Sequence, residues 1–304
     1  MIYTILVNWN GGEETIASLS SLMKLNVDKF HVLVCDNNST DESLEKLNNW
    51  VTEHKLTCVS ILQTGHNLGF AGGNNVGIKV ALKDPETTHI WLLNNDTLVD
   101  EKALTAMLQV MEKDPQIGIC GSTLLYEHDP KAIQAVGGYY NSWLGISSHA
   151  LGGEPYSAEL CKSVDPGKFD YIVGASMLVS REFIEKVGLM DEQYFLYCEE
   201  LDWATRAKRA GFKLGYAPQS IVYHKEGATT GSAAHIRRKA RSEFADRCAL
   251  RSHLIYARKF HPVRKWTVWL FYIVKSIKRL MQGDIRGSAR VLACFFNVKH
   301  FISI

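Results

Sequence analysis

Short apolar runs alternate with helix-like segments through the first third of the chain, and this alternation limits the fold more than any other feature. The runs occupy residues 3–7, 30–35, 59–62 and 90–93. Each is too short to span a membrane, and residues 90–93 are uniformly apolar, as in a strand buried on both faces of a parallel sheet. Strands alternating with helices at roughly 25 to 30 residues per unit are typical of right-handed βαβ units. We therefore predict an α/β fold with a mainly parallel central sheet and flanking helices.

Polar side chains follow three of these strands. Their clusters are Asn8/Asn10, Asp36/Asn37/Asn38 and Asn94/Asn95/Asp96. Such residues also form turns and helix caps, and one cluster alone would be explained in that way. Because the carboxyl ends of parallel strands share one edge of a sheet, where ligands bind, three clusters together favour a binding crevice. Asp96 is the only carboxylate in its triplet and is the first candidate to hold a divalent metal against a diphosphate.

The glycine-rich loop after the third strand does not match the common nucleotide fingerprints. Gly69, Gly72, Gly73 and Gly77 do not satisfy G-x-G-x-x-G and do not follow the first strand. No G-x-x-x-x-G-K-[ST] sequence is present either. The loop therefore argues against a nicotinamide enzyme and a P-loop enzyme.

A second cluster of acidic residues lies near residue 200. Glu199, Glu200 and Asp202 precede Arg206 at the expected start of a helix. Acidic residues favour helix N-termini, and Asp202 with Arg206 could be an ordinary surface pair. The aromatic run at residues 194–197 favours a catalytic site instead. His224 ends a later strand before a Gly/Ser/Thr loop; a lone histidine is usually structural, but one in this position can bind a metal.

Length, charge and cysteine content set further limits. A chain of 304 residues with 46% hydrophobic residues is long enough for one large domain and an appendage. Residues 235–304 contain 16 Lys/Arg and 3 Asp/Glu, which predicts an anionic partner, either a membrane surface or a nucleic acid. The seven cysteines form no Cys-x-x-Cys pair, and the N-terminus has no signal-peptide pattern, so we expect a cytoplasmic protein without a disulfide framework.

Taken together, these blocks resemble the inverting family 2 glycosyltransferases of the GT-A fold, and within them the bacterial rhamnosyltransferase-like group. The resemblance covers residues 3–232. It is carried by Val7-Asn8-Trp9-Asn10, Asp36-Asn37-Asn38-Ser39-Thr40-Asp41, Asn67-Leu68-Gly69-Phe70-Ala71-Gly72-Gly73-Asn74, Asn94-Asn95-Asp96, Glu199-Glu200-Leu201-Asp202 with Arg206, and His224.

The resemblance implies a role for each matched position. Asn8 and Asp36 would line the base and ribose of the donor, and Asn67 and Gly72 would belong to a donor loop. Asn94-Asn95-Asp96 occupies the position of the D-x-D motif. Asn38 and Arg206 are further expected donor-binding residues. Because Asn94 replaces the first Asp of that motif, Mg²⁺ or Mn²⁺ would be coordinated mainly by Asp96, the donor diphosphate and His224. Glu200 matches the general base, where the family more often has Asp, and Glu199 and Asp202 would support it.

The resemblance also predicts the reaction, the partners and the domains. The expected donor is dTDP-L-rhamnose, and the expected acceptor is a glycan or lipid-linked saccharide used in the synthesis of a bacterial cell-surface polysaccharide. The alternatives are an enzyme that uses a UDP-hexose or UDP-N-acetylhexosamine, and a non-catalytic protein that binds nucleotide sugars. Residues 1–234 form the predicted catalytic domain and 235–304 a basic, amphipathic helical region. An acidic crevice does not fit nucleic acid, so residues 265–275 are expected to lie on a membrane surface, or else to pack on the catalytic domain or a second subunit.

Overall fold

The computed structural model describes residues 1–225 and 242–296. The predicted domain boundary at residue 234 and the loop at 227–232 lie outside these ranges. Within them, nine strands form a central sheet in the order β3-β2-β1-β4-β10-β6-β11-β5, with β7 on β6. These strands are β1 (Ile2–Asn8), β2 (Phe30–Asp36), β3 (Val59–Gln63), β4 (His89–Asn94), β5 (Thr97–Val99), β6 (Ile117–Tyr126), β7 (Ile133–Ala135), β10 (Ser176–Ser180) and β11 (Lys213–His224).

The register of the sheet aligns the polar strand ends. Asn8 at the end of β1 pairs with Asp36 at the end of β2, and Val7 pairs with Asn94 at the end of β4, all in parallel. Antiparallel β10 lies between β4 and β6, and β11 returns parallel to β6. The predicted mainly parallel α/β sheet is confirmed, and the three Asx clusters reach the same edge.

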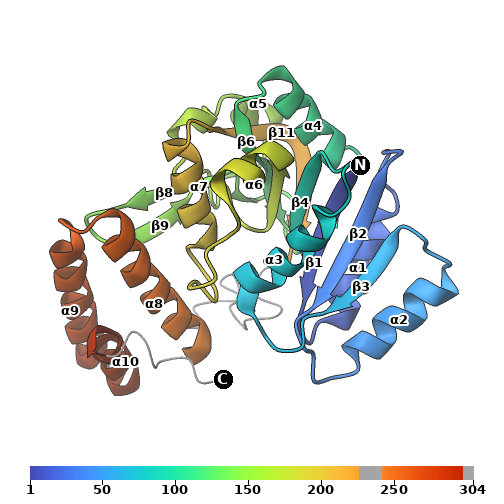
Figure 1. Cartoon of the computed structure of the whole chain (residues 1–304). Helices are drawn as coiled ribbons and strands as arrows, with labels where there is room; N and C mark the ends of the chain where they lie inside the picture. Colours follow the sequence, from blue (N-terminus) through green and yellow to red (C-terminus); the bar gives the residue numbers. More distant parts are fainter. Residues whose placement is uncertain (226–241, 297–304) are drawn as a thin grey trace.

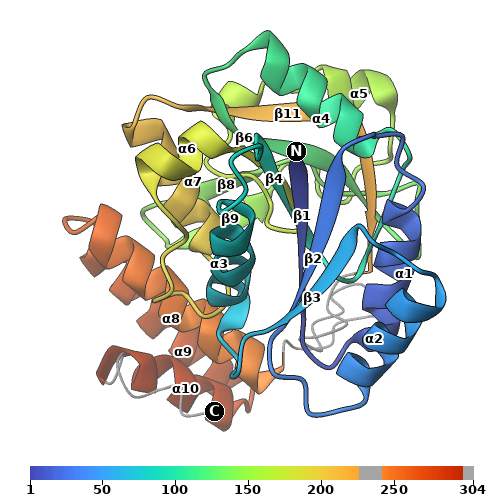
Figure 2. The ribbon, with the colours of Figure 1, turned by 45° about the vertical axis from the view of Figure 1, so that its right-hand side comes forward.

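Helices cover both faces of the sheet (Figure 1 and Figure 2). α3, α6 and α7 lie on one face, and α1, α2 and α4 lie on the other. The helices around the sheet are α1 (Gly12–Leu22), α2 (Ser43–Glu53), α3 (Gly69–Ala81), α4 (Ala103–Lys113), α5 (Ala158–Lys162), the short 3₁₀ helix η1 (Pro166–Lys168), α6 (Arg181–Val187) and α7 (Glu199–Arg209). Apolar side chains from each sheet face and its helices form two cores, so β4 is buried on both sides as its sequence predicts.

Three local features differ from what the amino-acid sequence predicts. The strand-like run at residues 171–180 predicts a strand over its whole length, but β10 begins only at Ser176, and residues 173–175 line the pocket described below. Residues 214–217 and 221–223 read as two short strands, but they belong to one strand, β11, whose register shifts between Ala217 and Ile221. Pro218 lies in this bulge because it has no N–H to donate to the ladder. Finally, Thr40 or Asp41 is the N-cap that the sequence predicts for α2, whereas Glu42 occupies that position and Asp41 Oδ1 accepts from the N–H of Ser43 at 3.0 Å.

Residues 126–168 are rich in Gly, Tyr, Ser and Pro without clear periodicity, which predicts an irregular segment carrying binding loops, but the segment contains a β-hairpin. Its strands, β8 (Gly138–Asn141) and β9 (Ile146–His149), pair antiparallel and form a separate two-stranded sheet. In Figure 1 the hairpin extends from the sheet domain toward the C-terminal helices. It therefore links the body of the sheet to the last part of the chain.

The C-terminal helices α8 (Glu243–Phe260), α9 (Lys265–Met281) and α10 (Ile285–Phe296) form a compact group beside α7 (Figure 1). They share a small core of Leu250, Leu254, Ala257, Val268, Tyr272 and Val291. None of the helices among the described residues is long and apolar enough to cross a membrane.

Candidate active site

A single pocket opens at the carboxyl edge of the sheet. It is lined by the ends of β1 and β4, the donor loop before α3, the turn before α7, and His224 at the end of β11. The lining residues are Val7, Trp9, Asn37, Asn67, Gly69, Phe70, Leu93, Asn94, Asn95, Asp96, His149, Val173, Gly174, Ala175, Phe195, Leu196, Tyr197, Glu199, Glu200, His224 and Phe244. The predicted crevice therefore exists and contains residues from both acidic clusters.

Asp96 and His224 meet in this pocket although they are far apart in sequence. His224 Nε2 lies 3.1 Å from Asp96 Oδ1, and Asn94 Nδ2 lies 3.2 Å from the same nitrogen. On the other side of the ring, His224 Nδ1 lies 2.7 Å from Oε1 of the buried Gln134. A proton on Nδ1 that is donated to Gln134 leaves the Nε2 lone pair directed toward Asp96, which is how metal-binding histidines are usually oriented.

This pair fits a divalent cation that is shared with a ligand. No group of three or more His, Cys, Asp or Glu residues with metal-binding geometry occurs in the described part of the chain. Asp96 and His224 supply two metal ligands, an oxygen and a nitrogen. Mg²⁺ and Mn²⁺ commonly complete their coordination with phosphate oxygens and water. The side chains present thus suit a metal that binds together with a diphosphate.

Asn8 and Asp36 lie behind the pocket wall. Asn8 Nδ2 donates to Asp36 Oδ1 at 2.8 Å, and Asp36 Oδ2 accepts from the backbone N–H of Ser39 at 3.0 Å. Thr15 donates to Asn8 Oδ1 and accepts from Asn95 Nδ2. These bonds join the loops after β1, β2 and β4, so the two residues shape the edge, and neither is among the residues that line the pocket.

The donor loop is organised by Asn37, which belongs to the second matched motif but was not a predicted site residue. Its Nδ2 donates to Asn67 Oδ1 and to the carbonyl of Gly69, while its Oδ1 accepts from the N–H of Leu68. Asn67 and Asn37 line the pocket. Gly72 lies inside α3, where an added Cβ would be 2.6 Å from the Leu68 side chain, so the absence of a side chain allows close packing. Asn38 is exposed in the loop after β2 and has a φ of 63°.

Glu199 and Glu200 begin α7 and also line the pocket. Two non-glycine residues in the left-handed region, Tyr197 and Cys198 with φ of 70° and 68°, immediately precede them. Consecutive left-handed residues store strain, and such strain is concentrated at functional sites. Glu199 is buried, with no hydrogen-bond partner for Oε2 among the described residues, whereas Glu200 is half-buried.

Burial decides the protonation of these two carboxyl groups. Burial raises the pKa of Glu200 to about 7. Burial and then the neighbouring Glu200 carboxylate raise the pKa of Glu199 well above its ordinary value. Desolvation thus outweighs the effect of the helix N-terminus, which would favour the ionised form of Glu200, and Arg206 donates instead to Asp202.

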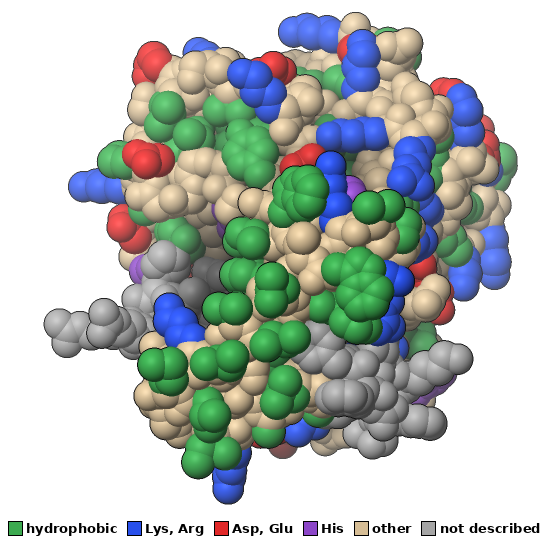
Figure 3. Space-filling model, turned by 90° about the vertical axis from the view of Figure 1, so that its left-hand side faces the viewer, with side chains coloured by type: hydrophobic (Ala, Val, Ile, Leu, Met, Phe, Trp, Pro, Cys, Tyr) green, Lys and Arg blue, Asp and Glu red, His purple; other side chains and the backbone are tan. Residues whose placement is uncertain are grey.

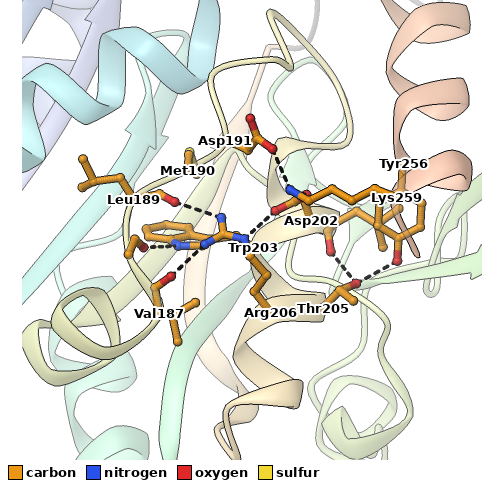
Figure 4. A network of polar contacts seen from close by, with 12 residues as sticks. Val187, Leu189, Met190, Asp191, Asp202, Trp203, Thr205, Arg206, Tyr256 and Lys259 are labelled. Atoms are coloured by element: carbon orange, nitrogen blue, oxygen red, sulfur yellow. Dashed lines mark hydrogen bonds and ion pairs between the residues drawn. The ribbon is translucent and has the colours of Figure 1, made fainter.

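Arg206 and Asp202 form a structural network on the far side of α7 (Figure 4). Arg206 donates to Asp202 Oδ1 at 2.6 Å and to the carbonyls of Val187 and Leu189. Asp202 is fully buried, and its other oxygen accepts from Lys259 Nζ of α8 at 2.6 Å. Neither Asp202 nor Arg206 is among the pocket-lining residues, and their hydrogen bonds and ion pairs hold α7 against the loop before it and against α8.

The loop that presents the two glutamates is held from both sides. From α3, the buried Asn75 exchanges hydrogen bonds with the backbone of Met190 at 2.9 and 3.2 Å. From α8, Ser252 donates to the carbonyl of Leu196 at 2.8 Å, and Lys259 bridges Asp191 and Asp202. The C-terminal helix α8 is thus part of the framework of the site.

Several residues of the site were not predicted. Trp9 and Phe70 line the pocket, belong to the matched motifs and could have been chosen from them. His149, which lines the pocket, and Gln134, which contacts His224, lie between residues 126 and 168, and nothing in their local sequence places them near residue 224. Only the tertiary structure brings them there.

A mainly parallel sheet with a pocket at its carboxyl edge, lined by Asp96 with His224 and by Glu199 with Glu200, is the arrangement expected of a GT-A glycosyltransferase fold. The chain belongs to glycosyl transferase family 2, whose model matches residues 4–188. Glu199, Glu200 and His224 lie beyond the matched residues. The protein is therefore a glycosyltransferase, as predicted.

Individual relatives agree with this assignment. The chain is 26% identical over 224 residues to the low-salt glycan biosynthesis hexosyltransferase Agl10 of Haloferax volcanii, covering 73% of this chain and 66% of Agl10. It is 25% identical over 303 residues to the N-acetylglucosaminyl-diphospho-decaprenol L-rhamnosyltransferase of Mycobacterium tuberculosis, covering 86% and 94%. Among solved structures, a Pyrobaculum calidifontis mannosyltransferase in complex with GDP-Man and Mn²⁺ superimposes with a TM-score of 0.59 at 13% identity, covering 96% of this chain and 74% of that one.

Proposed function

We propose that this protein transfers L-rhamnose from dTDP-L-rhamnose to a saccharide acceptor, with inversion at the anomeric carbon. The observation that carries the proposal is that one pocket is lined by the Asp96–His224 pair and by Glu200. The mycobacterial relative, which aligns over nearly its whole length, is named a rhamnosyltransferase. This supports rhamnose over a UDP-hexose or UDP-N-acetylhexosamine donor.

The proposed base is Glu200. An acceptor hydroxyl oxygen attacks the anomeric carbon, the bond from that carbon to the diphosphate oxygen breaks, and the electron pair leaves with the nucleotide diphosphate. Glu200 accepts the hydroxyl proton. A carboxylate with a pKa of about 7 is well matched to this task near neutral pH, since a base is most effective when its pKa is close to the working pH. Protonated Glu199 would avoid a second negative charge beside it.

The proposed metal site consists of Asp96 and His224, with Gln134 fixing the orientation of the imidazole ring. A divalent ion bound there, Mg²⁺ or Mn²⁺, would neutralise charge that develops on the leaving diphosphate. Asn37 and Asn67 hold the donor loop beside this pair and supply amide groups to the pocket.

The proposed acceptor is a lipid-linked saccharide, used in polysaccharide synthesis at the cytoplasmic face of the membrane. The relative whose name specifies a diphospho-decaprenol-linked N-acetylglucosamine supports this class of acceptor. A short-chain alkyl diphosphate ester of N-acetylglucosamine is a suitable water-soluble probe.

The test offers the purified chain dTDP-L-rhamnose, UDP-glucose and UDP-N-acetylglucosamine in turn, with Mn²⁺ and this probe, and determines the anomeric configuration of any product by NMR. We expect transfer from dTDP-L-rhamnose with inverted configuration. We also expect Glu200→Gln to lower kcat on the order of 10² to 10⁴-fold with little change in donor affinity, because Gln keeps the shape but accepts no proton. A retained configuration, or a fully active Glu200→Gln beside an inactive Glu199→Gln, would contradict the assigned mechanism.

A further inference from the structure

Helix α9 has two apolar faces, and within the described part of the chain only one of them is covered. Val268 and Tyr272 point into the small core shared with α8 and α10. The opposite side carries a continuous set of exposed apolar residues, which we call the α9 stripe: Trp266, Leu270, Ile273, Val274, Ile277, Leu280 and Met281. Their spacing of three and four residues places them along one side of the helix. A helix on the surface of a soluble protein normally has polar residues on this side.

The tip of the β8–β9 hairpin continues the same surface. Trp143 is 55% exposed, and Thr267 of α9 donates to its carbonyl at 2.7 Å. The Arg264 guanidinium lies 4.5 Å from the centre of the Trp143 ring. At the other end of α9, Ile285 of α10 is 68% exposed. Figure 3 shows hydrophobic side chains gathered on this side of the molecule with Lys and Arg among them.

We propose that this surface, formed by the α9 stripe and the hairpin tip, rests on an anionic lipid bilayer. α9 contains four basic residues and no acidic residue. Lys278 is exposed near the stripe, and Lys265 Nζ lies 5.2 Å from the centre of the Trp266 ring. Tryptophan and lysine beside an aliphatic face are typical of a helix that lies in the membrane interface.

The charge of α9 also argues against a second copy of this chain as the occupant. In a two-fold symmetric dimer the same patch meets itself, so the cations beside the stripe would face one another. Like charges brought together across an interface are unfavourable, whereas lipid phosphates would neutralise them. An anionic bilayer would bury the apolar α9 stripe and would neutralise the basic residues beside it.

The hairpin connects this surface to the pocket. β9 leads from the hairpin tip to His149, which lines the pocket. The six residue steps from Trp143 to His149 span at most about 20 Å, at roughly 3.3 Å per residue. A saccharide attached to a membrane lipid could therefore reach the pocket while its lipid chain remains in the bilayer. This inference rests on the proposed lipid-linked acceptor and adds the surface that would bring the pocket to it.

The test measures cosedimentation of the full chain with vesicles of phosphatidylcholine, with and without phosphatidylglycerol. The double variant Leu270→Glu/Ile277→Glu places two charges in the stripe, and Lys102→Glu, on the exposed end before α4, is its control because both change the net charge by −2. We expect wild type and Lys102→Glu to bind the anionic vesicles and the double variant to bind at least about tenfold more weakly. Equal binding by all three proteins, or by none, would overturn the proposal.

Two further measurements separate the alternatives. Sedimentation velocity without vesicles reports the oligomeric state, and a wild-type dimer that the double variant converts to a monomer would assign the surface to self-association and reject the bilayer. Transfer of rhamnose to the water-soluble probe should be equal in wild type and the double variant. If that transfer occurs without vesicle binding, only the membrane inference fails; if vesicles bind but no transfer occurs to soluble or vesicle-borne probe, the proposed function fails.

Discussion

At the scale of single residues, burial controls the chemistry of Glu200. Because its pKa in the free protein is about 7, we expect kcat/KM to rise with pH through about 7 and to reach a plateau above it. The folded-state pKa lies above the unfolded value, so the contribution of this carboxyl to stability is complete at low pH and is lost as the pH rises through about 7. Glu200→Gln should therefore raise Tm relative to wild type increasingly between about pH 5 and about pH 8. A pH profile with its midpoint near the ordinary value for Glu, or a Tm difference independent of pH, would show that desolvation does not govern this group.

The Asp96–His224 pair makes a second prediction at this scale. Asp96→Ala should lower metal-supported activity by at least about 10²-fold, and His224→Ala should do so less severely, since the diphosphate also supplies oxygen ligands. Gln134→Leu removes only the partner of Nδ1 and should weaken Mn²⁺ affinity about 10- to 100-fold. Calorimetric titration of Mn²⁺ in the presence of dTDP measures this without turnover. Full activity in excess EDTA, or a Mn²⁺ titration unchanged in His224→Ala, would remove the corresponding residue from the site.

At the scale of elements, α8 holds the loop that presents Glu199 and Glu200. Lys259→Met leaves Asp191 without its cation and Asp202 with Arg206 alone, so the turn before α7 should loosen. We expect a higher KM for the acceptor with a smaller change in kcat, measured well below Tm, and rescue by Lys259→Arg. Arg258→Met, on the same helix but stacked over Trp269, is the control. A variant that loses only Tm and keeps both kinetic constants would indicate that Lys259 stabilises the fold without positioning the loop.

At the scale of the whole molecule, donor and metal should stabilise the native fold together. A ligand at about 100 times its Kd adds about 2.7 kcal/mol to the free energy of unfolding, which raises Tm by roughly 4 °C for a chain of this size. We expect dTDP with Mn²⁺ to give such a rise and thymidine with Mn²⁺ to give much less, because thymidine has no diphosphate to share the ion. Asp96→Ala should lose the part of the rise that depends on Mn²⁺. Equal shifts with and without the metal would argue against a shared site.

The sheet, and the edge at which the pocket forms, follow from local sequence patterns. Apolar runs with helical segments between them specify buried parallel strands, because the periodicity of side chains is a local property. The Asx clusters mark where those strands end, and the crevice lies at their shared edge. The crevice could therefore be predicted from the strand pattern, and Asp96, Glu200 and His224 could be selected from the amino-acid sequence and its family resemblance.

What each of these residues contacts depends on the tertiary structure. Asn8 and Asp36 turn toward each other behind the pocket, and Asp202 pairs with Lys259 of α8. Arg206 donates to the carbonyls of Val187 and Leu189, and Gln134 reaches His224 from β7. The pKa of Glu200 depends on how much water its neighbours exclude, and the outer stripe of α9 is recognised only because Val268 and Tyr272 already fill the inner side. These properties arise from contacts between distant parts of the chain, which local sequence patterns do not encode.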